Sequence, residues 1–121
     1  MRRLARDEER ERRISMEIVV DAYGPEEQAM GWYYSLEDRL SFPFLARCVA
    51  ERAISPLRVG DEVEVVGMAP EEECGHEMFV LTRWERGTLA VPLAQLDGIG
   101  VDEQTRQAMD DWQYWVAHYE L

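Results

Sequence analysis

The sequence predicts an α+β domain, in which a small curled antiparallel sheet of SH3-like type has one helix before it and one after it in the chain. Two observations lead to this class. Residues 44–92 contain short runs of alternating polar and apolar residues separated by turn residues, which is typical of antiparallel strands. Residues 25–40 and 103–119 instead repeat their apolar residues every three or four positions, which is typical of helices packed on one face.

The first helix is expected over residues 25–40. Gly24 turns the chain, Pro25 suits the first helical position, and the two glutamates that follow complement the positive end of the helix dipole. The sequence Phe-Pro-Phe at 42–44 ends the helix. Its buried stripe is expected to consist of Ala29, Trp32, Tyr33, Leu36 and Leu40.

The first 15 residues are expected to form a charged, flexible N-terminal arm. They contain six of the thirteen arginines, four acidic residues and little apolar surface, which indicates a solvated tail or a frayed helix. Residues 16–121 are then a single domain, with Met16 as an alternative start. Residues 17–23 look like a short strand that leads into this domain.

Strands and turns are expected between the two helices. In the second strand, Val63 and Val65 alternate with acidic residues and should face the core. An acidic loop follows at 69–76, and a short helical turn with a loop follows at 93–100. The expected strands are 44–53, 61–68, 77–84 and 88–92, the last two joined by a tight hairpin.

The last element is expected to be a helix over 103–119 that begins at a capping Asp102. The aromatic residues of both helices should pack in the core, since a small chain must bury its four tryptophans. A peptide-binding groove made of the same aromatic residues is the alternative. The apolar stripe of this helix consists of Ala108, Met109, Trp112, Trp115 and Val116.

The charge of the chain limits its partners. The net charge is −12, and residues 16–121 alone hold 7 basic and 21 acidic side chains. Nucleic acid is excluded as a partner because a polyanion needs a basic face. No apolar run reaches the roughly 20 residues of a membrane span, and no signal peptide is seen, so we expect a cytoplasmic protein without a membrane partner. In that compartment Cys48 and Cys74 should be free thiols.

Strand pairing is expected to bring carboxylates together at one end of the sheet. If the first two strands pair, residues 37–43 lie beside the acidic loop, and if the last two pair, the segment up to Asp97 reaches the same end. Like charges crowded there do not help an empty fold, whereas a calcium ion takes about 6–8 oxygen ligands. The candidate metal ligands are Asp38, Glu37, Glu71, Glu72, Glu73, Glu77 and Asp97.

Other interpretations compete with a calcium site. Composition alone favours solvated acidic loops, and the chain has no EF-hand loop. Cys74 and His76 could begin a zinc site, but the remaining cysteine and histidine do not form a metal-like pair. No nucleophile motif, phosphate loop or cofactor fingerprint is present, so we expect no enzyme. The adjacent Asp110 and Asp111 are expected to face solvent.

Long strings of this sequence resemble the CcbP-type calcium-binding proteins first known from cyanobacteria. They are VDAYGPEEQAMGWYYSLEDRLSFPF (20–44), RAISPLRVGDEVEVVGMAPEEECGHEMFV (52–80), LAVPLAQL (89–96) and DWQYWV (111–116). The resemblance covers about residues 16–121. It implies a small acidic cytoplasmic protein that binds calcium without EF-hands and buffers or senses it. The matching acidic motifs are LED (36–38) and PEEEC (70–74). The alternative is an SH3-like module that binds a protein partner through its aromatic or acidic surface, without metal.

Overall fold

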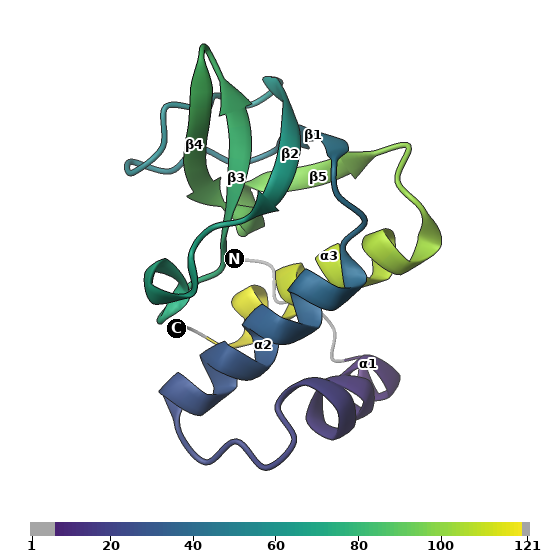
Figure 1. The fold of residues 1–121 in the computed structure, drawn as a ribbon. Coiled ribbons are helices and arrows are strands. Elements are labelled where there is room, and N and C mark those ends of the chain that lie inside the picture. The colour runs from purple at the N-terminus through teal and green to yellow at the C-terminus, as the bar shows by residue number, and fades with distance from the viewer. Residues whose placement is uncertain (1–6, 120–121) are drawn as a thin grey trace.

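A five-stranded antiparallel sheet lies on one side of a pair of long helices, and a short N-terminal helix lies on the other side of that pair (Figure 1). The computed structural model describes residues 7–119. The strand order is β4-β3-β2-β1-β5, which gives an open sheet. The predicted α+β class is confirmed, but the SH3-like type of sheet is not. The strands are β1 (Phe44–Cys48), β2 (Glu62–Met68), β3 (Phe79–Trp84), β4 (Gly87–Pro92) and β5 (Leu96–Ile99).

The two long helices lie where the apolar periodicity places them. Helix α2 spans Pro25–Arg39 and helix α3 spans Glu103–His118. Asp102 caps α3, because its carboxylate accepts a hydrogen bond from the Thr105 backbone N–H at 2.7 Å. Within residues 7–119 no helix is long and apolar enough to cross a membrane.

Tryptophan rings form the contact between α2 and α3. Trp32 and Trp112 are both 0% exposed, and their ring centroids lie 5.1 Å apart in an edge-to-face arrangement. Trp115 lies 5.6 Å from Trp32. Core packing of these aromatic residues is therefore confirmed. Tyr34 differs, because it is 54% exposed. The predicted stripes are buried at Ala29, Trp32, Tyr33, Leu36, Leu40, Ala108, Met109, Trp112 and Trp115, while Val116 is partly exposed.

The register of the sheet turns Val63 and Val65 into the core, as the alternation predicts. Phe44 pairs with Val65 and Phe79 pairs with Pro92, so the expected hairpins form. Strand β1 ends at Cys48 rather than at residue 53. One further hydrogen bond, from the Val49 N–H to the carbonyl of Gln95 at 2.7 Å, continues the pairing with β5 just beyond this end.

Strand β5 is an element that the sequence did not predict. A 3-10 turn at Leu93–Gln95 leads into β5, which pairs with the free side of β1. Asp97 and Gly98 within it are typical turn residues, which is why a loop was expected. Gly98 is needed here because a Cβ atom would lie 2.9 Å from the methyl groups of Val101 and 3.2 Å from the sulfur of Met109.

The N-terminal residues differ most from expectation. Helix α1 spans Glu8–Arg13, and a π-helical turn, η1, continues it over Ile14–Ile18, so the strand expected at 17–23 is wrong. Of the two alternatives expected for the arm, a solvated tail or a frayed helix, residues 8–13 form a helix, and it is docked on the domain because Ile14 is buried and Arg10 and Arg13 contact Asp111. The four-residue spacing of Ile14 and Ile18 is a helical signal that the surrounding charges obscure. Residues 1–6 of the expected arm lie outside the described residues.

Candidate metal site

Two tyrosines of α2 hold the acidic loop between β2 and β3. This loop contains a 3-10 turn, η2, over Glu71–Cys74. The Tyr33 hydroxyl donates a 2.8 Å hydrogen bond to the backbone carbonyl of Ala69 just before the turn. The Tyr34 hydroxyl donates to a carboxylate oxygen of Glu71. The loop is therefore fixed to the C-terminal half of α2, where the sequence placed it.

Three carboxylates surround these phenols. Burial, followed by the charge of Glu37, raises the pKa of Tyr33, and Glu71 and Glu72 act in the same direction. The hydrogen bond to Glu71, then the charge of Glu71, raises the pKa of Tyr34, with a smaller contribution from Glu37. Glu37 and the glutamates of the acidic loop thus act on the same tyrosine, and their joint role as metal ligands stays a prediction. We call Glu37, Glu71 and Glu72 the acidic corner.

Among the described residues, the acidic corner has no ion-pair partner. All three glutamates are exposed, and within residues 7–119 none of them forms an ion pair with an arginine. Their like charges repel one another unless a cation offsets them. Exposed carboxylates next to backbone carbonyls and a phenol form a set of oxygen donors, which is the kind of ligand that calcium prefers.

Asp38 lies on a neighbouring side of α2. It lines a cleft between η1, α2 and α3 that also contains Glu17. Tyr34 borders the same cleft and at the same time contacts Glu71, so one side chain connects the cleft with the acidic corner. The remaining polar side chains of the cleft are Ser35, Arg39, Gln104 and Gln107.

Glu73 and Glu77 have different surroundings. Glu73 is exposed on η2, and its backbone N–H donates to the carbonyl of Pro70 at 2.9 Å. Glu77 already has a cationic partner, since both of its oxygens lie 2.7 Å from guanidinium nitrogens of Arg52. This hydrogen-bonded pair raises the pKa of Arg52. A metal ion would have to displace the arginine before Glu77 could bind it.

Asp97 does not join the other candidates, and its predicted place at their end of the sheet is wrong. It lies in β5 opposite Arg47, three residues along β1 from Phe44. Its carboxylate accepts a 2.7 Å hydrogen bond from Arg106 on α3. The error follows from the missing strand, because β5 returns along β1 and carries Asp97 away from the acidic loop.

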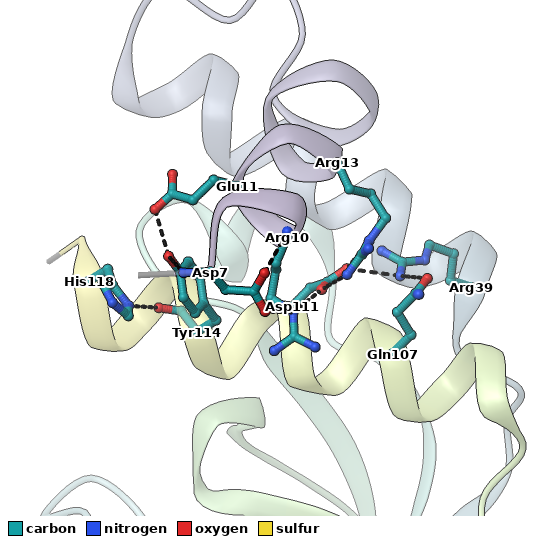
Figure 2. Close-up of polar contacts among 9 residues, drawn as sticks. All are labelled: Asp7, Arg10, Glu11, Arg13, Arg39, Gln107, Asp111, Tyr114 and His118. Atoms are coloured by element: carbon teal, nitrogen blue, oxygen red, sulfur yellow. Dashed lines mark hydrogen bonds and ion pairs between the residues drawn. The ribbon is translucent and has the colours of Figure 1, made fainter. Parts of the chain in front are cut away.

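Asp111 is the carboxylate whose surroundings differ most from the prediction. It was expected to face solvent, but it is 0% exposed and lies among Arg10, Arg13 and Arg39 (Figure 2). The apolar periodicity of α3 already indicated that Asp111 would be buried. Residue 111 lies three after Ala108 and four before Trp115, so it belongs to the buried face of α3.

The two cysteines are free and buried, as predicted. Burial raises the pKa of the Cys74 thiol, which favours the neutral form, and a neutral thiol is a poor metal ligand. Within residues 7–119 no three His, Cys, Asp or Glu side chains are placed so that they could hold a metal ion together. The carboxylates of the acidic corner fit calcium by type, and they would have to move closer to enclose it.

Comparison with known proteins identifies the family. The model of the CcbP family, described as calcium binding, matches residues 12–116. The chain belongs to the CcbP family of calcium-binding proteins. The resemblance seen in the sequence is therefore confirmed, and so is calcium as the ligand of the family.

Two solved structures of CcbP type are similar over nearly the whole chain. The crystal structure of Anabaena CcbP is 42% identical, covers 97% of this chain and 96% of its own, and has a TM-score of 0.84. A calcium-binding protein in its calcium-binding form is also 42% identical, covers 93% of this chain and 92% of its own, and has a TM-score of 0.81. Comparison with curated proteins gave no match.

Proposed function

We propose that this CcbP protein binds calcium at the acidic corner and acts in the cell as a calcium buffer or sensor. The observation that carries the proposal is the group of glutamates near Tyr33 and Tyr34, none of which forms an ion pair with an arginine of residues 7–119. Elsewhere, Asp97, Glu77 and Asp111 are each paired with arginine. In a chain with a net charge of −12, an unpaired group of this kind is the natural place for a cation.

Calcium binding at this place must change the loop. The ion takes about 6–8 oxygens at roughly 2.3–2.6 Å, so the carboxylates of η2 and α2 have to converge on it. The Tyr34 hydroxyl, which holds Glu71 in the structure, then has to share or release that carboxylate. Binding is therefore coupled to a rearrangement of η2 against α2, and a sensor could report calcium through this rearrangement.

The other candidate ligands take secondary places in the proposal. Glu73 is next on η2 and can contribute from the outer side of the loop. Asp38, one residue after Glu37, can bind a cation together with Glu17 across the cleft. Glu77 and Asp97 would have to give up charge-assisted hydrogen bonds of 2.7 Å, which are among the stronger hydrogen bonds in proteins, so we do not place them in the site.

Calorimetric titration with CaCl₂ tests the proposal. Glu71→Gln and Glu72→Gln should each weaken binding, because each removes one charged ligand while keeping the side-chain shape. Glu85→Gln is the matched control, since it makes the same charge change at the exposed turn between β3 and β4. A wild-type chain that takes up no calcium would refute calcium binding. Wild-type affinity in both η2 variants would place the site elsewhere.

A further inference from the structure

The N-terminal segment, which we define as residues 8–18, is attached to the helix pair by two buried isoleucines and by a network of polar contacts. Helix α1 contains no buried residue, and only Ile14 and Ile18 of the segment are buried. Next to it, the Asp7 backbone N–H donates to the Tyr114 hydroxyl at 3.0 Å, and that hydroxyl donates to Glu11 at 2.8 Å. The apolar part of the contact is therefore confined to two side chains in the second half of the segment, and its first half is held by polar contacts alone.

The strongest attachment is the carboxylate of Asp111. Two nitrogens of Arg13 donate to its two oxygens, at 3.2 and 2.7 Å, and Arg10 Nε lies 3.0 Å away (Figure 2). Both arginines belong to the N-terminal segment, and Asp111 belongs to α3. The hydrogen bond to Asp111 raises the pKa of Arg13, although burial opposes this change.

The third arginine at Asp111 does not belong to the segment. Arg39 is the last residue of α2, and it donates to Asp111 at 3.0 Å and to the Gln107 side chain of α3 at 3.1 Å. Arg39 is therefore held by the helix pair itself. If the segment leaves, Asp111 keeps one guanidinium partner and gains access to water. A buried carboxylate without any partner would make departure far more costly.

The connection to the rest of the chain permits such a movement. Residues 19–24 join η1 to α2, and Val20 and Tyr23 within them are exposed. Asp21 has a positive φ of 58°, which is typical of a turn. This connection contributes no buried residue to the core.

We propose that residues 8–18 form a detachable latch, which docks on and leaves the α2–α3 pair as a unit while the rest of the domain stays folded. Asp111 exchanges three arginine partners for Arg39 alone when the latch opens. Opening uncovers the surface of α2 around Gly31, against which the Ile18 carbonyl packs, and the surface of α3 around Asp111 and Tyr114. Because Glu17 belongs to the latch, a cation held between Glu17 and Asp38 would keep the latch docked, so its opening is tested in EDTA.

Hydrogen exchange of the full chain, followed by mass spectrometry, tests the latch. In the wild type, the amides of residues 11–18 should exchange at least about tenfold faster than those in the middle of α3, because local opening needs less free energy than global unfolding. Higher NaCl should increase this difference, since screening weakens attraction between partly exposed charges. Equal protection of the two regions would overturn the proposal.

Arg13→Gln and Arg39→Gln are matched variants, since each removes one guanidinium from the same carboxylate. Arg13→Gln should speed exchange of residues 11–18 by about 10- to 100-fold, the loss expected for hydrogen bonds to a charged group, and leave the middle of α3 unchanged. Arg39→Gln should instead speed exchange in α2 and α3, because the folded helix pair loses a hydrogen bond to Asp111. It should not speed exchange of residues 11–18 beyond that of α3, because opening the latch would then leave Asp111 without any arginine partner. Equal acceleration of all three regions by Arg13→Gln would mean that the segment leaves only on global unfolding, and would refute the latch.

Discussion

A methyl group added to α2 at Gly31 tests how closely the N-terminal segment fits the helix. The new Cβ atom of Gly31→Ala would lie 2.3 Å from the carbonyl oxygen of Ile18 and 3.4 Å from its carbonyl carbon. A normal contact requires the backbone of η1 to retreat by roughly 1 Å, which loosens the packing of Ile14 and Ile18. Overpacking of this kind costs about 1–3 kcal/mol.

Helix propensity acts in the opposite direction. Alanine is favoured over glycine in a helix interior by about 1 kcal/mol. Because the 2.3 Å contact is with backbone, which cannot rotate away, we take the upper part of the overpacking range, about 2–3 kcal/mol. The net expectation for Gly31→Ala is then a loss of about 1–2 kcal/mol, which corresponds to a decrease in Tm of about 4–10 °C for a domain of this size.

Urea unfolding followed by far-UV circular dichroism measures the effect. Gly75→Ala is the control, because a Cβ atom there meets nothing within 4 Å and the backbone φ of −70° suits alanine. If the variant releases the segment before the core unfolds, its m-value should also fall, since the main transition then exposes less surface. A Gly31→Ala protein as stable as the wild type, or more stable, would show that the segment does not pack on α2 as described.

Three further predictions concern calcium and charge. Saturating calcium at 100 times Kd should stabilise the chain by about 2.7 kcal/mol relative to EDTA in a thermal melt, and equal midpoints would contradict binding. Calcium should lower the pKa of Tyr34 in an absorbance titration, because it competes for the Glu71 carboxylate, whose hydrogen bond and then charge raise that pKa. Hydrogen bonds from the backbone and hydroxyl of Thr105, then from Ser41, lower the pKa of Asp102. The ionised Asp102 cap therefore stabilises the fold fully above the unfolded pKa of about 3.9, and this stabilisation is lost as the pH falls through the lower folded pKa. In Asp102→Asn the free energy of unfolding should consequently fall less steeply between neutral and acidic pH than in the wild type.

Much of the fold could be predicted because its signals are local. Short stretches of sequence are enough to show the apolar periodicity of α2 and α3 and the alternation of β2. The burial of Trp32, Trp112 and Val65 follows from these patterns. Strand β5 has no such signal. Its pairing with β1 is a long-range contact, and local turn chemistry at Gly98 indicated a loop.

The candidate site stays a prediction, but the structure shows which of its parts local signals could place. Contact of the η2 loop with α2, through Tyr34 and Glu71, follows from a helix and one hairpin that the sequence indicates. The predicted position of Asp97 was wrong because it depends on β5, which the sequence did not predict. Asp111 failed because its partners Arg10 and Arg13 come from a segment about 100 residues away, and charge alone does not show which arginine will meet which carboxylate.

In helix α2, the tryptophan that contacts α3 is directly followed by the two tyrosines that hold the acidic loop. Trp32 packs edge-to-face on Trp112, and the next two residues, Tyr33 and Tyr34, hold the acidic loop. Indoles this close couple electronically, so their near-ultraviolet dichroism and emission depend on small changes in the spacing of α2 and α3. A rearrangement of the loop that shifts α2 would change this signal. The protein therefore contains its own optical reporter, with which ion binding can be followed in unlabelled samples.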